Sequence, residues 1–155
     1  MNRGDQQRIL RCLEYGMSVL VGSVDAEGHP ACCRAVGLTS CDNLATLTVF
    51  VPVATSADTM ANIAATGRLA VGGTHPIEHC ATQLKGVVQA TRRAREDEEP
   101  FIQEHLGGFV AILNSLGYPP RVTNALVHWP AFAIDMRVDE IYEQSPGPKA
   151  GIRLR

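Results

Sequence analysis

The chain has 155 residues, of which 45% are hydrophobic and 19% are charged, and its formal net charge is -2 at pH 7. This length and composition fit one folded domain and exclude a largely disordered protein. The slight negative charge and the 5% aromatic content argue against nucleic acid as a partner, and no apolar run approaches the ~20 residues of a membrane span.

The first element predicted is a short amphipathic helix over Asp5–Tyr15, with Asp5 as its N-cap. Ile9 and Leu13 lie on its predicted apolar face. The residues before it lack the basic-then-apolar order of a secretory signal, so we expect a cytoplasmic protein.

Three strands are predicted next, over residues 17–25, 30–38 and 44–53, because β-branched and apolar residues alternate there. Asp25-Ala26-Glu27-Gly28 is typical of a turn in which glycine supplies a positive φ. We therefore expect a hairpin, followed by a third strand in meander order.

Arg34 is the only cationic residue between Arg11 and Arg68, and it falls within the second predicted strand. Because side chains alternate along a strand, the face opposite Arg34 carries only small residues, namely Ala31, Cys33, Ala35 and Gly37. A flat ligand could lie against that face with the guanidinium near its anionic end. The alternative is an arginine that reaches solvent or pairs with a carboxylate.

The second half of the chain continues with mixed elements. They are a helix over 55–66 with Thr55 and Asp58 at capping-box spacing, strands over 68–73 and 81–91, a helix over 100–116, and an alternating region over 125–143 interrupted at Pro130. About six strands joined by short turns predict a mainly β fold, an antiparallel barrel with flanking helices.

A single domain over residues 1–155 is expected. Its parts are an N-terminal helix over 1–16, a barrel core over 17–94, a helical insertion over 95–121, last strands over 122–144 and a basic tail over 145–155. We expect the ordered part of the domain to end before the tail.

Three motifs in order resemble a known family. The hairpin Val24–Pro30, the helix start Thr55–Ile63 followed by Arg68–Val71, and the strand Gln83-Leu84-Lys85-Gly86 are similar to those of the pyridoxamine 5'-phosphate oxidase-like proteins. The resemblance implies a six-stranded antiparallel split barrel of the FMN-binding type. It also implies a homodimer with two flavin sites at the subunit interface.

The resemblance carries cofactor contacts onto eight residues of this chain. They are Arg34, Ala35, Val36 and Gly37 after the hairpin, Ser56 and Thr59 for the phosphate, and Gln83 and Lys85 on the later strand. Helix N-terminal amides and hydroxyl groups suit a phosphate. However, Ala57 and Asp58 stand where the family commonly has basic residues, so FAD, deazaflavin and haem remain alternatives to FMN.

The implied function is a flavin-dependent oxidoreductase with an unknown small-molecule substrate. Pyridoxamine phosphate is not the expected substrate, because residues 135–142 hold one arginine and no histidine, unlike the substrate-binding segment of the true oxidases. The flavin carries the redox chemistry, so no catalytic residue is assigned. The alternative is a flavin-binding or haem-binding protein without catalysis on the same barrel.

Histidines and cysteines offer a weaker hypothesis. His75, Glu78, His79 and Cys80 have the residue types of a metal site, but Pro76 interrupts the helical spacing, so no metal is predicted. His105 is expected on a helix surface. The five cysteines are expected to be reduced thiols, because their number is odd and the chain shows no sign of export.

Overall fold

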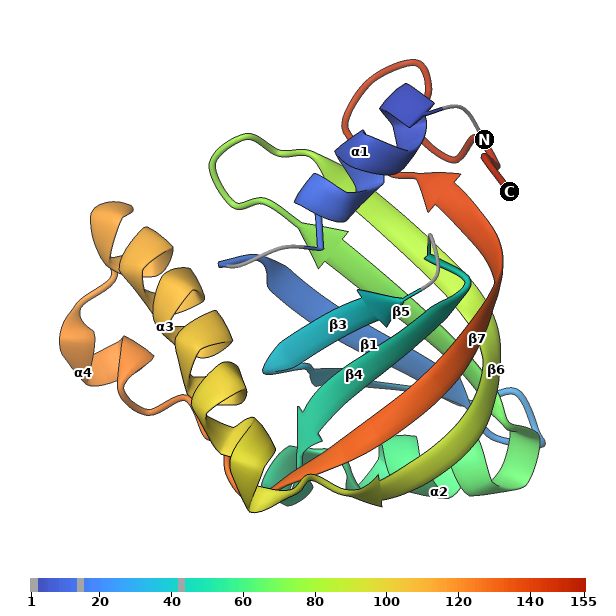
Figure 1. Ribbon diagram of the computed structural model, residues 1–155, viewed down its shortest axis with the longest axis horizontal. Helices are drawn as coiled ribbons and strands as arrows, with labels where there is room; N and C mark the ends of the chain where they lie inside the picture. Colours follow the sequence, from blue (N-terminus) through green and yellow to red (C-terminus); the bar gives the residue numbers. More distant parts are fainter. Residues whose placement is uncertain (1–2, 14–15, 42–43) are drawn as a thin grey trace.

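The computed structural model describes residues 3–13, 16–41 and 44–155 and shows one strongly curled antiparallel sheet with helices around it (Figure 1). The strands are β1 (Ser18–Val24), β2 (Pro30–Arg34), β3 (Gly37–Cys41), β4 (Thr46–Pro52), β5 (Arg68–Thr74), β6 (Ala81–Arg93) and β7 (Ala131–Glu143). The helices are α1 (Arg3–Arg11), α2 (Ala57–Thr66), α3 (Glu99–Ser115) and α4 (Pro120–Thr123).

The mainly β fold is confirmed, but among the described residues the sheet has seven strands rather than six, in the order β2-β1-β5-β6-β7-β4-β3. The predicted strand over 30–38 is two strands, β2 and β3, at opposite ends of that order. Between them Ala35 donates its N–H to the carbonyl of Val19 on β1, and Val36 donates to that of Phe50 on β4. The segment pairs with β1 and with β4 as a meander predicts, but it does so through two separate strands, because the chain crosses from β1 to β4 between them.

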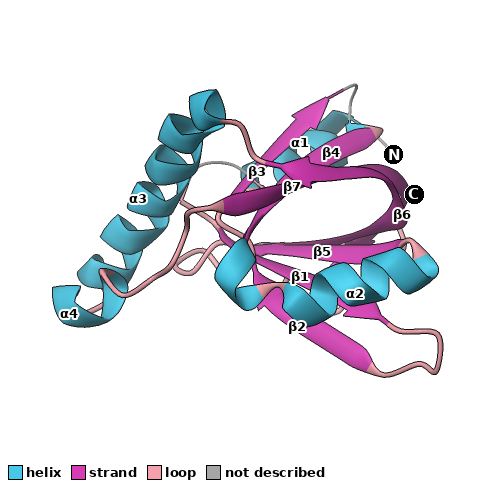
Figure 2. Cartoon of the chain, turned by 90° about the horizontal axis from the view of Figure 1, so that it is seen from below, coloured by secondary structure: helices cyan, strands magenta, loops and turns pink. Residues whose placement is uncertain are grey.

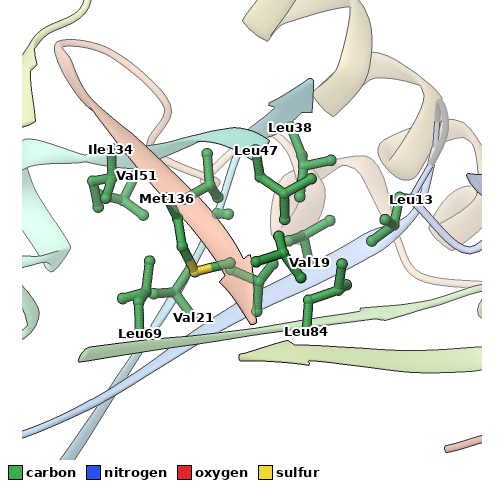
Figure 3. Packing of buried hydrophobic residues seen from close by; sticks show 14 of the residues in the cluster. Leu13, Val19, Val21, Leu38, Leu47, Val51, Leu69, Leu84, Ile134 and Met136 are labelled. Atoms are coloured by element: carbon green, nitrogen blue, oxygen red, sulfur yellow. The ribbon is translucent and has the colours of Figure 1, made fainter. Parts of the chain in front are cut away.

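The inner face of the curled sheet holds the main hydrophobic core (Figure 3). Val19, Val21 and Leu84 are no more than 1% exposed, whereas their neighbours Leu20 and Lys85 are exposed, which is the period of two expected of strands. Alternate residues of β1 and β6 therefore point outward, away from this core.

Helix α1 lies at one end of the barrel and α2 at the other (Figure 1). In α1, Ile9 is buried, whereas Asp5 lies in the first turn, so it is not the N-cap. The predicted end of this helix at Tyr15 lies outside the described residues. Helix α2 packs on β1 and β2, where Asn62 donates a hydrogen bond to Ser23, and it ends at Gly67 with φ 66° as a left-handed cap.

Helix α3 stands to the side of the barrel, away from α2 (Figure 2), and forms a second core with β4 and β7. Its Ile102 is fully buried among Val36 and Phe50. His105 on the same helix is 4% exposed, so the expected surface position is wrong. Burial lowers the pKa of His105, which favours its neutral form.

An ion pair between Arg92 and Glu98 stabilises the segment that connects β6 to α3. The guanidinium of Arg92 on β6 donates two hydrogen bonds of 2.7 Å to the carboxylate of Glu98. These bonds lower the pKa of Glu98 from 4.5 to about 2. A lowered pKa stabilises the fold above the unfolded value, and this stabilisation is lost as the pH falls toward 2.

We therefore expect Glu98→Gln to lower the free energy of unfolding by ~1 kcal/mol at pH 7 and by much less near pH 2. Urea unfolding of both proteins across this pH range measures the difference. Glu104→Gln, at an exposed carboxylate on α3, is the matched control and should change stability by less than ~0.5 kcal/mol at either pH. An equal effect of Glu98→Gln at both pH values would contradict the assignment.

The C-terminal tail is part of the folded domain, contrary to expectation. Leu154 packs against the main core and its N–H donates to the carbonyl of Ile141 at 2.7 Å. The guanidinium of Arg155 donates to the carbonyl of Leu44.

The last strand region also differs from the sequence prediction, because a single strand, β7, begins directly after Pro130. Within the described part of the chain, every helix is too short or too polar to span a bilayer.

Candidate functional site

The outer face of the sheet carries an open groove over β2, β1, β5 and β6, which we call the outer-face groove. The strand register places Cys32 beside Gly22, Gly22 beside Ala70, and Ala70 beside Lys85. These residues form one row across four neighbouring strands, and the hollow over the row has a volume of about 740 Å³. This volume is within the range of small-molecule and cofactor pockets.

Small residues make the floor of the outer-face groove. A Cβ atom added at Gly22 would find nothing within 4 Å, so the groove is open above this strand. Val24 and Pro30 line one side of the groove and Val87, which is 40% exposed, lines the other. A planar, largely apolar ring system could therefore approach the backbone closely between these side chains.

The carboxylates that line the groove are already engaged. Arg137 donates to Asp139 at 2.8 Å, and this hydrogen bond lowers the pKa of Asp139. Glu140 accepts a hydrogen bond from the hydroxyl of Tyr142, which raises the pKa of that tyrosine.

The cations of the groove have no such partners. Among the described residues, neither Lys85 nor Arg68 forms an ion pair, and the Lys85 ammonium lies 4.8 Å from the centre of the Tyr142 ring. Glu140 lies opposite Lys85 in the strand register but is not within ion-pair distance of it. Among the described residues both cations are therefore open to an anionic ligand.

Three of the eight predicted contact residues share the outer face. These three are Arg34, Gln83 and Lys85. Gln83 lies two residues before Lys85 on β6, so the strand register places Gln83 and Arg34 together in the neighbouring row across the same four strands. Leu20 and Gly72 separate them within that row, a distance of roughly 14 Å at the usual strand spacing.

The guanidinium of Arg34 is used within the chain. It donates to the hydroxyl of Ser18 at 3.1 Å and lies 5.0 Å from the centre of the Phe109 ring on α3. Among the described residues Arg34 forms no ion pair with a carboxylate, the partner that the alternative predicted, and it stacks on the helical insertion instead. The role of Arg34 in binding a cofactor stays a prediction.

Three of the four small residues predicted to face a flat ligand, Cys33, Ala35 and Gly37, are covered by other parts of the chain. Cys33 and Ala35 are buried in the main core. A Cβ atom at Gly37 would lie 3.2 Å from the Phe101 ring of α3 and 3.3 Å from Phe50. The N–H groups of Ala35 and Val36 are bonded to β1 and β4, as described above. Phe101 of the insertion therefore covers Gly37, the main core covers Cys33 and Ala35, and Ala31 lines the outer-face groove.

The predicted phosphate contacts are also inside the protein. Ser56 is fully buried and its hydroxyl donates to the carbonyl of Pro52 at 2.7 Å, while Thr59 is 1% exposed. Ser56 itself is the N-cap of α2 and makes no side-chain capping bond, so the Thr55 and Asp58 capping box is wrong. A phosphate role for Ser56 and Thr59 stays a prediction that this geometry does not favour.

The histidine-rich turn is not helical. Nδ1 of His75 accepts the backbone N–H groups of Ile77 at 3.3 Å and Glu78 at 3.1 Å, so this nitrogen is committed to the turn. Among the described residues the group with metal-ligand spacing is instead Asp25, Glu27 and His29, at the exposed tip of the β1–β2 hairpin. Internal hydrogen bonds between His29 and Asp25 already account for this cluster.

Of the residues that line the outer-face groove, Lys85 is a predicted cofactor contact and Ala31 lies on the face predicted for a flat ligand, whereas Gly22, Ala70 and Arg68 were not predicted. Gly22, Ala70 and Arg68 come from strands whose order along the sheet was not predicted. The sequence signal for Gly22 and Ala70 was the alternation of side chains along a strand. Their neighbours Val21 and Val71 point into the core, so Gly22 and Ala70 face outward.

No protein-family model matches the sequence, and no curated protein matches it. Among solved structures, a protein from Clostridium acetobutylicum related to general stress protein 26, of the pyridoxinephosphate oxidase family, is similar with a TM-score of 0.61 and 13% identity, covering 100% of this chain and 96% of its own. An FMN-binding protein from Syntrophomonas wolfei is similar with a TM-score of 0.50 and 12% identity, covering 99% and 94%. The haem storage protein HutZ from Vibrio cholerae is similar with a TM-score of 0.50 and 11% identity, covering 88% and 92%.

These likenesses cover nearly whole chains at low sequence identity, so they concern the fold. The chain therefore has the split-barrel fold of the pyridoxamine 5'-phosphate oxidase-like proteins.

Proposed function

We propose that this protein binds a planar, anionic redox cofactor, FMN in the first place, in the outer-face groove. The observation that carries the proposal is a pair of cations, Lys85 and Arg68, that form no ion pair with any described residue and lie beside the glycine floor of the groove. The fold supports it, because one similar solved structure is an FMN-binding protein. Bound flavin would supply hydride or electron transfer, and the proposed activity is that of an oxidoreductase with an unknown substrate.

The groove of a single chain is open to solvent above its floor, so we propose that a second copy covers it. Leu20 is 44% exposed and Val87 is 40% exposed on this face, whereas a monomer gains nothing from apolar side chains in water. In the proposed homodimer these side chains are covered and the flavin ring is shielded from solvent.

The test is a titration of the purified full-length protein with FMN and with riboflavin, followed by flavin fluorescence. We expect FMN to bind at one per chain and riboflavin, which lacks the phosphate, to bind at least about 10-fold more weakly. A visible flavin spectrum in the untreated protein would support the same conclusion. Failure of both ligands to bind at micromolar concentrations would overturn the proposal.

Lys85→Met should weaken FMN binding by about 10- to 150-fold, because a charge-assisted contact to phosphate contributes ~1.5–3 kcal/mol. The same substitution should leave riboflavin binding within about 2-fold, since that ligand carries no anionic group. Arg121→Met on α4, at an exposed cation outside the groove, is the matched control. Equal loss of both ligands would place Lys85 in the structure of the groove rather than at the phosphate.

Haem is the second candidate, and one observation in the groove favours it. Cys32 is exposed and lines the outer-face groove, and a cysteine thiolate is a ligand type that proteins use for haem iron. A titration with haem should then give a shifted Soret band that Cys32→Ala removes. Haem binding that Cys32→Ala leaves unchanged would exclude this mode.

Catalysis and simple binding differ in redox behaviour. An oxidoreductase loaded with FMN is expected to accept electrons from a nicotinamide donor and pass them to an acceptor with repeated turnover. A storage or sensing protein would hold the cofactor without turnover. Bleaching of the flavin spectrum under anaerobic conditions measures the first step.

A further inference from the structure

Two cysteines that are far apart in the sequence meet at the end of the barrel covered by α1. Cys12 directly follows α1 and Cys80 directly precedes β6, and their Sγ atoms lie 2.8 Å apart. Cys12 belongs to the main core, and Cys80 packs against it. All five cysteines are free thiols in the structure, and no other cysteine among the described residues has this contact.

We propose that Cys12 and Cys80 are a site of reversible disulfide formation, oxidised by a low-molecular-weight disulfide such as oxidised glutathione. The Cys80 thiolate attacks one sulfur of this disulfide, which forms a mixed disulfide and releases one thiolate. The Cys12 thiolate then attacks the Cys80 sulfur, forms the protein disulfide and releases the second thiolate. Two cysteine thiols are oxidised, one external disulfide is reduced to two thiols, and the two cysteine protons end on the released thiolates.

Exposure assigns the order of the two attacks. Cys12 is 2% exposed, so an oxidant cannot reach it from solvent, whereas Cys80 is partly exposed. Cys80 therefore meets the oxidant first, and Cys12 resolves the mixed disulfide from inside. An S–S bond is about 2.05 Å long, so closing the contact takes a movement of only about 0.8 Å.

The surrounding structure already holds α1 against the barrel at this point. A Cβ atom at Gly73 of β5 would overlap the carbonyl oxygen of Cys12 and would lie 2.8 Å from a methyl group of Leu13. The disulfide would therefore form between segments that are already in contact, and α1 would not have to move to a new position. The disulfide links positions 68 residues apart, which favours a marked stabilisation of the oxidised form.

The second attack is expected to be slow at neutral pH. Burial, the hydrogen bond and charge of Cys80, and the charge of Glu78 together raise the pKa of Cys12 to about 12, although Arg8 opposes the shift. The thiolate fraction of Cys12, and with it the closing rate, should rise about 10-fold per pH unit between pH 7 and 10.

The experiment incubates the reduced full-length protein with oxidised glutathione and follows peptide masses after alkylation and digestion. We expect a linked peptide pair containing Cys12 and Cys80, a loss of about 2 Da relative to the reduced protein, and a melting temperature raised by about 4–10 °C. Dithiothreitol should reverse all three.

Cys80→Ser and Cys12→Ser should each abolish the linked pair, and Cys41→Ser, at an exposed cysteine elsewhere, should leave it unchanged. Cys12→Ser should accumulate glutathione on Cys80, which confirms the order of attack even where Cys80→Ser lowers stability. The proposal is overturned if prolonged oxidation leaves Cys12 free to alkylation in the denatured protein, or if the linked peptides join other cysteines.

Discussion

Replacing Gly22 by leucine is expected to weaken FMN binding by at least about 100-fold, or roughly 3 kcal/mol, without loss of the fold. Gly22 forms the floor of the outer-face groove, and the space above its Cα holds no atom within 4 Å of an added Cβ. A leucine side chain would therefore enter the groove without displacing protein atoms. Flavin fluorescence titration measures the affinity, and thermal unfolding monitors the fold.

Gly107→Leu is the matched control for this substitution. Gly107 lies on the exposed side of α3 and also has nothing within 4 Å of an added Cβ, but it is outside the groove. It should bind FMN like the wild type. If Gly22→Leu bound FMN as tightly as Gly107→Leu, the cofactor could not lie over β1 in this groove.

Gly86→Ala is expected to have the largest effect on stability, a loss of more than about 3 kcal/mol in the free energy of unfolding. Gly86 follows a register shift between β6 and β7, and an added Cβ would overlap the carbonyl oxygen of Arg137. Because the obstacle is backbone rather than a flexible side chain, β6 and β7 would have to separate. Urea unfolding measures the loss, and failure to obtain soluble protein would agree with it.

Gly22→Ala provides the comparison in a strand of the same sheet where the new methyl group is free. We expect its free energy of unfolding to lie within about 1 kcal/mol of the wild type. Equal urea midpoints for Gly86→Ala and Gly22→Ala would contradict the close approach of β6 and β7.

Local patterns in the sequence predicted much of the fold. Alternating apolar residues marked β1, β4, β5 and β6 to within a few residues, and Gly28 and Gly67 adopt the positive φ that their turn and helix cap require. Both signals are local, because they depend on backbone preferences and on one buried face. The family resemblance added the split barrel, which the solved structures confirm.

Long-range features were the ones that failed. Residues 30–38 keep a strand-like alternation while the chain crosses from β1 to β4, so period two alone could not show the break at Ala35 and Val36. The docking of Phe101 against Gly37 covers part of the face predicted for a flat ligand, and it depends on the position of an insertion that no local pattern fixes. For the same reason the contact of Cys12 with Cys80 could not be read from spacing.

Binding of FMN between two copies of the chain can be measured by sedimentation velocity of the mixture, recorded at the visible absorption band of the flavin. We expect the flavin absorption to sediment with a species of twice the 16.7 kDa chain mass, at one flavin per chain. With Gly22→Leu, the visible absorption of the flavin should not sediment with the protein. Protein that sediments at the mass of a single chain, with the flavin left behind in solution, would contradict a groove closed by a second copy.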